Sequence, residues 1–211
     1  LSSHNDISYF VCCVFKQKTA YVIRLSLVGS ERCRRDRVFP FHEDEDVPEP
    51  RVDTYDYMRS GYDRGHMCPA GDNKWDAEAM EQSFLMTNIC PQNRNLNRGD
   101  WKDLEELERT WATRHGTVYI VAGPMYTRKD PPSIGNHKVA VPDSFFKVLL
   151  VAGGAEPQAY AFVFRNEAGS RPLKSYQHTV DEVEALTGID FFPALPDGVE
   201  ARVEAALNLL D

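Results

Sequence analysis

DRGHMCPAGDNKW, which spans residues 63–75, places an arginine two positions before a histidine, among two acids and two glycines. The stretch is too polar to fill a core, and a linker would not carry a tryptophan and a histidine. Residues two apart on a strand point to one face, so we expect Arg64 and His66 to face the same way. A guanidinium that holds phosphate oxygens, beside a histidine that takes a proton from water, suits a phosphodiester. Without this context, His66 would be an ordinary structural histidine.

A second polar cluster follows in NICPQNRNLNRGDWKDLEELER, residues 88–109. Asn97, Glu105 and Arg109 are separated by eight and four residues, and on a helix these steps stay near one face. That stripe is distinct from the apolar one formed by Trp101, Leu104, Leu107 and Trp111. An amide oxygen near a carboxylate suits Mg²⁺. Taken alone, Glu105 and Arg109 would be better explained as an ordinary exposed ion pair between residues four apart on a helix.

The remaining patterns predict an α+β fold with a mostly antiparallel central sheet flanked by helices. Apolar periodicity and capping residues predict helices at 74–86, at 100–116 with Asp100 as the cap, from Thr179 to Gly188, and at 198–211. Strands are expected at 62–68, 84–92, 117–126, 145–152 and 158–166, and a polar loop at 93–99. Pro91 is expected to stop the second of these strands. No linker divides residues 38–211, so we expect them to form one domain.

Composition sets the broad class. The chain has 211 residues, 42% hydrophobic content and a net charge of −8. It contains no apolar run of the ~18–20 residues that a membrane span needs. A net negative charge counts weakly against a polyanionic ligand, because a local basic patch can serve a site in an acidic protein. Five cysteines without a C-x-x-C pair give no zinc-finger or redox signature.

Residues 1–37 differ in character from the rest of the chain. VCCVFKQKTAYVIRLSLVGSERCRRDR, residues 11–37, resembles the conceptual translation of a sequencing adapter, which would make this segment non-native. The alternative is a natural pair of apolar strands. On the adapter interpretation, a signal peptide would be hidden and only Cys68 and Cys90 would remain to consider.

The two polar clusters together resemble the DNA/RNA non-specific endonuclease family, within the ββα-metal (His-Me finger) superfamily. YDRGHMCPAGDNKW, NICPQ, LNRGDW, VAGPMY, VAVPDSFFKVLL and TGIDFFP occur in the order and at the spacing of that family, and cover residues 38–196. The resemblance therefore implies a ββα-metal motif within the α+β domain.

The resemblance also implies residue roles. His66 would be the general base, and Asn97 the one direct protein ligand of Mg²⁺, with Mn²⁺ as a substitute. Glu105 would act on the ion through water, and Asn88 would be an active-site amide. Arg64 and Arg109 would contact phosphate. The residues expected to bind nucleic acid are Arg64, Lys74, Arg94, Arg98, Lys102 and Arg109, each of which could also be ordinary surface charge.

The expected function is hydrolysis of DNA and RNA to 5′-phosphate products with little sequence preference. A catalytically impaired nucleic-acid-binding protein and a phosphodiesterase for another ligand are the alternatives. The resemblance leaves a homodimer and a protein inhibitor open as partners, gives no membrane association, and implies a secreted or periplasmic bacterial protein. Cys68 and Cys90 could form a disulfide or remain free thiols. His137 and the Phe191–Phe192 pair are expected to be structural.

Overall fold

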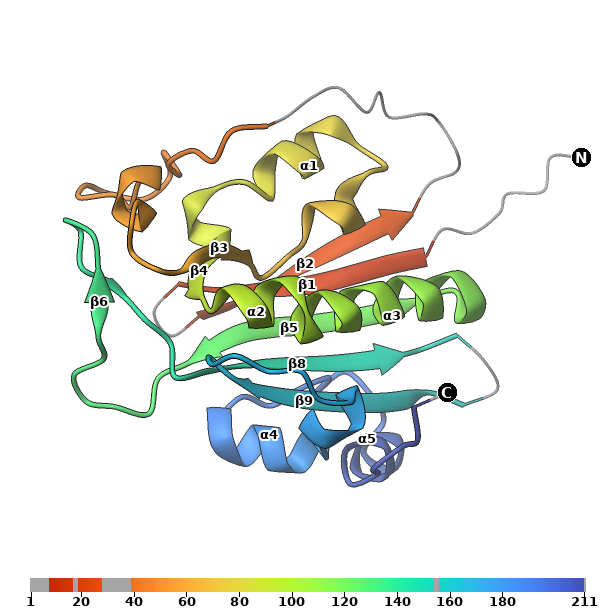
Figure 1. Cartoon of the computed structure of the whole chain (residues 1–211). Helices are drawn as coiled ribbons and strands as arrows, with labels where there is room; N and C mark the ends of the chain where they lie inside the picture. The colour runs from red at the N-terminus through yellow and green to blue at the C-terminus, as the bar shows by residue number, and fades with distance from the viewer. Residues whose placement is uncertain (1–7, 17–18, 28–38, 154–155, 211) are drawn as a thin grey trace, which may run out of the picture.

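The centre of the fold is a four-stranded antiparallel sheet in the order β10-β9-β8-β5. Its three long strands, β9, β8 and β5, lie side by side in Figure 1. Its members are β5 (Val118–Met125), β8 (Ser144–Val151), β9 (Gln158–Arg165) and β10 (Gln177–His178). The computed structural model describes residues 8–16, 19–27, 39–153 and 156–210, with side chains described from residue 39 onward. The three long strands confirm the predicted ones, because their β-branched and aromatic residues suit a sheet buried on both sides.

Helices cover both faces of this sheet. Residues Phe145 and Leu149 of β8 pack with Trp101 of α3 (Asp100–His115), whereas Phe146 and Val148 pack on the opposite face. That second face is covered by α4 (Val180–Thr187) and α5 (Asp197–Glu204), which lie beside β9 in Figure 1. The alternation of side chains along β8 therefore feeds two hydrophobic layers, and the predicted α+β class is confirmed.

A small finger lies beside the sheet and carries the polar clusters. Its strands β3 (Asp63–His66) and β4 (Ile89–Gln92) pair antiparallel, with Gly65 opposite Cys90. Helix α2 (Arg94–Arg98) follows β4 at once and leads into α3. Two strands followed by a helix are the ββα arrangement that the resemblance implied.

The finger is tied to the sheet by one amide. Asn166, which follows β9, donates from Nδ2 to the carbonyls of Pro91 at 2.9 Å and Pro142 at 3.0 Å. Its Oδ1 accepts the backbone N–H of Asn93 at 2.7 Å. Three bonds from one side chain thus fix the end of β4 and the start of α2 against the sheet.

Short elements fill the connections. They are η1 (Thr54–Tyr57), η2 (Ala70–Asn73), α1 (Ala77–Gln82), η3 (Met86–Asn88), β6 (Ser133–Ile134), β7 (Val139–Ala140) and η4 (Leu173–Tyr176). Among the described helices, none is both long and apolar enough to cross a bilayer.

Several predicted boundaries around the finger are wrong. The helix expected at 74–86 is shorter, because Asp76 caps it by accepting the N–H of Ala79 and the chain turns again at η3. The strand expected at 84–92 begins only at Ile89, and Pro91 lies within it opposite Arg64 instead of ending it. The expected loop at 93–99 contains α2, because the Asn93 side chain accepts two backbone N–H groups of its first turn.

Two helix ends also differ from the prediction. Gly99, not Asp100, is the N-cap of α3, and the Asp100 carboxylate accepts the Tyr176 hydroxyl instead. The helix predicted at 198–211 is α5, which begins at Asp197 and ends at Glu204. By contrast, the Thr179–Glu182 capping box and the left-handed Gly188 bound α4 as predicted.

An N-terminal hairpin falls within the segment that resembles an adapter. Strands β1 (Ser8–Lys16) and β2 (Thr19–Leu27) pair antiparallel, and β1 lies beside β5 in Figure 1. The non-native origin of residues 1–37 stays a prediction, as does the division of the chain at residue 38.

Candidate functional site

A cationic cavity of about 500 Å³ opens beside β3 and α2. Four arginines line it, namely Arg59, Arg64, Arg94 and Arg98. Asp63 is the single acid among the described residues of its wall, and Asn97 lies on the same wall. The cavity therefore brings together Arg64 of β3 and Asn97 of α2, which the sequence predicted for one site.

Asp63 organises one side of this cavity. Its carboxylate accepts the Arg98 side chain at 2.6 Å and 3.2 Å, the Arg94 side chain at 3.4 Å and the Asn97 amide nitrogen at 3.3 Å. Burial would raise the pKa of Asp63, but the hydrogen bonds and charge of Arg98 outweigh it and lower the pKa below its usual value. Asp63 therefore stays ionised and holds two arginines and the amide of Asn97 in place.

Arg64 is held from the opposite side. Its Nη2 donates to both the carbonyl and the hydroxyl of Thr54 at 2.6 Å. Its guanidinium carbon lies 5.2 Å from the centre of the Phe41 ring and 5.7 Å from that of Tyr57. The buried Nε has no hydrogen-bond partner among the described residues. Thr54 thus orients the side chain in advance. Nη1, which is not buried, has no partner among the described residues either and is the donor that a ligand could reach.

His66 lies on the same face of β3 as Arg64, as predicted, because both contact Phe41. Its ring centre is 5.4 Å from that of Phe41 and 5.2 Å from that of Phe84. Burial lowers the pKa of His66 to about 4, so the ring is neutral at pH 7. Within the described part of the chain, neither ring nitrogen has a hydrogen-bond partner, and Nε2 is closed off from solvent. A neutral and unpartnered imidazole is the state that a proton acceptor needs.

Asn97 and Glu105 offer oxygen ligands of the kind that Mg²⁺ takes. The Asn97 amide donates to Asp63 through Nδ2. Its Oδ1 accepts no hydrogen bond from any described residue, so it is free to bind a cation. Glu105 is partly buried, and its Oε1 lies 4.0 Å from Nζ of Lys147. Burial raises the pKa of Glu105, and Lys147 is the first group that opposes this shift. An amide oxygen and a carboxylate are donors that suit a hard divalent ion. Asn97 lines the cationic cavity, whereas Glu105 does not.

Two predicted site residues are occupied by structural contacts. The Asn88 amide donates to the carbonyls of Cys68 and Ser83 and accepts the N–H of Cys68 at 2.9 Å, so it fixes the turn that follows His66. Arg109 donates to the buried carboxylate of Asp72 at 2.9 Å. Among the described ion pairs, none joins Arg109 to Glu105, so the exposed ion pair considered as an alternative does not form. The roles of Asn88 and Arg109 in catalysis stay predictions.

The predicted nucleic-acid contacts divide into two groups. Arg94 and Arg98 are exposed and border the cavity, as Arg64 does. Lys74 is exposed, and Lys102 pairs with Glu106 at 3.2 Å, away from the cavity lining. Sequence reasoning missed Arg59, whose backbone has a φ of 57° and whose side chain also lines the cavity. Its one signal was its position five residues before Arg64.

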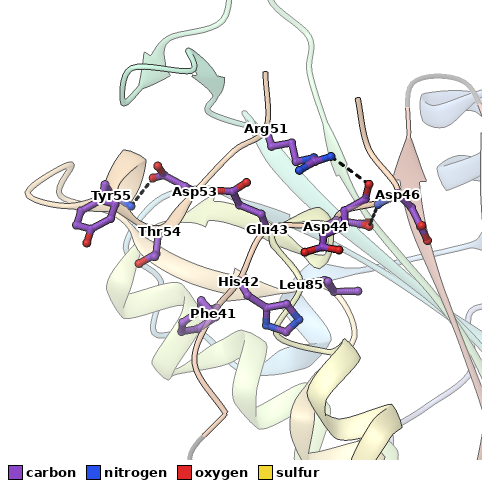
Figure 2. Close-up of a pocket in the computed structure, with 11 residues that line it drawn as sticks. Phe41, His42, Glu43, Asp44, Asp46, Arg51, Asp53, Thr54, Tyr55 and Leu85 are labelled. Atoms are coloured by element: carbon purple, nitrogen blue, oxygen red, sulfur yellow. Dashed lines mark hydrogen bonds between the residues drawn. The ribbon is translucent and has the colours of Figure 1, made fainter. Parts of the chain in front are cut away.

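A larger pocket of about 620 Å³ is unsuited to a polyanion. Figure 2 shows Glu43, Asp44, Asp46 and Asp53 around Arg51 in this pocket. The acids outnumber the basic groups of its wall, so its field repels phosphate. Phe41 lies between this pocket and the cationic cavity, because it lines both.

The cysteines and His137 settle two open questions. Cys68 and Cys90 are free thiols, and burial raises the pKa of Cys90 to about 12. His137 binds the buried Asp56 through Nδ1 at 2.8 Å, which agrees with a structural role. Phe191 is buried in the layer under α4, as expected.

Comparison with known proteins identifies the family. The model of the DNA/RNA non-specific endonuclease family matches residues 4–198. The chain belongs to this family. The match begins inside the segment 1–37 and ends within α5.

Curated members of the nuclease family give the same relationship. The chain is 34% identical to mitochondrial endonuclease G of Bos taurus over 72% of this chain and 56% of that protein. It is 35% identical to mitochondrial nuclease 1 of Schizosaccharomyces pombe over 80% and 58%, and 39% identical to mitochondrial nuclease EXOG of Mus musculus over 70% and 44%. The chain therefore spans about half the length of these relatives.

A solved structure shares the fold. The crystal structure of the EndoG/EndoGI complex, described as the mechanism of EndoG inhibition, superposes with a TM-score of 0.69 at 30% identity. The superposition covers 74% of this chain and 69% of that chain.

The expectation of a secreted or periplasmic protein is wrong. These relatives are mitochondrial nucleases of animals and yeast. The argument for export from a Cys68–Cys90 disulfide also fails, since both thiols are free.

Proposed function

We propose that this chain is a Mg²⁺-dependent endonuclease that hydrolyses phosphodiester bonds of DNA and RNA and leaves 5′-phosphates. The single observation that carries the proposal is a neutral, unpartnered His66 on the same face of β3 as Arg64, which lines the arginine cavity. His66 does not itself line that cavity, but its ring contacts Phe41, which does. Family membership and the nuclease names of the relatives support it.

Each residue has a separate task in the proposed reaction. His66 takes a proton from the attacking water through Nδ1, since Nε2 is closed off from solvent. Such a step contributes typically ~10²–10⁴-fold to rate. Arg64, already oriented by Thr54 through Nη2, offers Nη1 to a non-bridging phosphate oxygen as negative charge develops there. Arg94 and Arg98 hold the flanking backbone at the rim of the cavity.

Asn97 would hold the cation directly and Glu105 would hold it through water. The ion supplies charge neutralisation for the departing 3′ oxygen when bound. Asp63 supports this arrangement, since it binds the nitrogen of the Asn97 amide and leaves the oxygen without a partner. Mn²⁺ should replace Mg²⁺, because oxygen ligands accept both ions.

Little sequence preference is expected. The proposed contacts are arginines, which bind phosphate oxygens present at every nucleotide. The same contacts serve deoxyribose and ribose strands. The EndoG/EndoGI structure supports a protein inhibitor as a further partner, whereas a homodimer rests on the sequence resemblance alone.

A digestion assay tests the proposal. The full chain is incubated with supercoiled plasmid or total RNA, with Mg²⁺, Mn²⁺ or EDTA, and the ends are tested for 5′-phosphate. We expect cleavage of both polymers with either metal and none with EDTA. His66→Ala should lose at least ~10²-fold in rate while keeping the wild-type circular dichroism spectrum.

The other outcomes separate the alternatives. Binding without cleavage would support a nucleic-acid-binding protein. No effect on either polymer, together with hydrolysis of a small phosphodiester such as bis(p-nitrophenyl) phosphate, would support a different substrate. A folded His66→Ala protein with the wild-type rate would refute the role of His66.

A further inference from the structure

A lysine lies buried in the middle of the sheet. Lys147 of β8 has a side chain that is 0% exposed, and it falls between Phe145 and Leu149 on the face covered by α3. Its ammonium lies 3.1 Å from Oε2 of Glu108 and 4.0 Å from Oε1 of Glu105. The Trp101 ring covers the same nitrogen, with its centre 4.6 Å away.

One carboxylate would be enough to compensate this ammonium, yet two face it. Burying an ion costs several kcal/mol unless it is paired, and Glu108, itself fully buried, supplies that pair. Burial alone would lower the pKa of Lys147, but Glu108 and Glu105 raise it, so the group stays charged. Glu105 is thus not needed to keep Lys147 in the core.

Glu105 differs from the other buried acids in its access to solvent. Its side chain is 13% exposed, against 0% for Glu108 and 1% for Asp72. Of these three carboxylates, Glu105 is therefore the one whose oxygens can reach an ion bound at the surface.

We propose that Lys147 is a positioning residue that fixes the Glu105 carboxylate for the cation held by Asn97 and Glu105. The inference rests on the proposed function and adds a residue to it. A glutamate side chain has three rotatable bonds, and its ion pair with an ammonium locked in a strand removes much of that freedom. One Glu105 oxygen is held from beneath while the other is left for the ion. Glu108 anchors Lys147 from the next turn of α3.

The test measures metal binding without catalysis. Mn²⁺ affinity is determined by electron paramagnetic resonance on the full chain without nucleic acid. The variants are Lys147→Gln, Glu105→Gln and the double variant. Lys147→Gln should weaken Mn²⁺ binding by about 10–100-fold, as loss of a residue that orients a metal ligand does. In the Glu105→Gln background it should cause no further loss, because Lys147 acts through Glu105.

A control removes a charge far from this site. Arg202 of α5 pairs with Glu156 at 3.4 Å and carries no oxygen ligand for a cation. Arg202→Gln should bind Mn²⁺ with wild-type affinity. Wild-type Mn²⁺ affinity in Lys147→Gln would overturn the proposal. So would a loss of Mn²⁺ affinity from Lys147→Gln that is equal in the wild-type and Glu105→Gln backgrounds.

A second variant covers a failure to fold. If Lys147→Gln does not unfold cooperatively, Lys147→Met combined with Glu108→Leu replaces the whole buried pair by apolar groups, a change that proteins often tolerate. This protein should show the same loss of Mn²⁺ affinity, and wild-type affinity would overturn the proposal. If the wild-type chain binds no Mn²⁺, the metal dependence of the proposed function fails and this inference fails with it. If the wild type binds and cleaves but the variants bind equally well, only this inference fails.

Discussion

The two phenylalanines over His66 should control the pH at which the protein is active. Burial lowers the pKa of His66 from 6.5 to about 4. At pH 5.5, a group with a pKa of 4 is about 97% neutral, whereas one with a pKa of 6.5 is only about 9% neutral. Phe84→Ala removes the ring that meets His66 edge-on at 5.2 Å and lets water reach the imidazole. The variant should therefore retain about a tenth of its pH 8 rate at pH 5.5, where the wild type stays near its maximum.

Nuclear magnetic resonance gives the pKa itself. The ring carbons of His66 are followed from pH 3 to 8 in EDTA, with His66→Gln to assign the signal. We expect a midpoint near 4 in the wild type and one shifted toward 6.5 in Phe84→Ala. Phe192→Ala is the matched control, because this half-buried ring lies in the layer under α4 and should leave His66 unchanged. A wild-type midpoint near 6.5, or an unchanged midpoint in Phe84→Ala, would refute the reasoning.

The same shift predicts how stability depends on pH. The folded protein binds a proton at His66 less readily than the unfolded chain, whose histidine has a pKa near ~6.5. The stabilising effect of the neutral, buried ring is therefore complete above pH 6.5 and is lost as pH falls toward about 4. Urea unfolding of the wild type and His66→Gln should show this difference in slope.

Three further substitutions test the packing around the site. Gly65→Ala should unfold the finger, because the new Cβ would lie 2.6 Å from Cβ of the buried Gln92. We expect the wild-type thermal melting transition to be lost, and an unchanged midpoint would contradict this packing. Arg109→Leu should cost about 3 kcal/mol in urea unfolding, since it leaves the Asp72 carboxylate buried without its partner, and a change below about 1 kcal/mol would contradict that pairing. Thr179→Ala should cost about 1 kcal/mol through loss of the capping box while cleavage is unchanged.

Local patterns in the sequence predicted the parts of the site that depend on one element. The strand period placed Arg64 and His66 on one face, and both contact Phe41. Helical spacing placed Trp101 and Leu104 in the core layer under α3. These predictions hold because side-chain direction follows from backbone geometry alone.

Pairings between distant segments could not be predicted in this way. The sequence left an ion pair between Arg109 and Glu105 open as the alternative to a phosphate contact, but Arg109 binds Asp72, which is 37 residues earlier. Lys147 was missed, although a single lysine in the apolar run FFKVLLV was a usable signal. Such a residue must find a buried acid, yet only the packing of α3 on β8 shows which one.

The predicted boundaries of the elements in the finger were also wrong, and the reason is local. A cap at Asn93 lets the mostly polar segment Arg94–Arg98 form α2, because the side chain satisfies two N–H groups that would otherwise be free. The segment has too little apolar content for periodicity to reveal a helix. It is nevertheless α2 that carries Asn97 to the wall of the cavity.

The amide of Asn166 has a consequence for the order in which the protein is made. It bonds to Pro91 and Asn93, which leave the ribosome more than seventy residues earlier. A nascent chain that ends before β9 carries the motif of β3, β4 and α2 but lacks the side chain that pins it. The proposed site is therefore assembled late in synthesis, and we expect a fragment taken from the finger alone to lack the fixed geometry of the full chain. Moving this motif onto another scaffold would require a donor at the place of Asn166 as well.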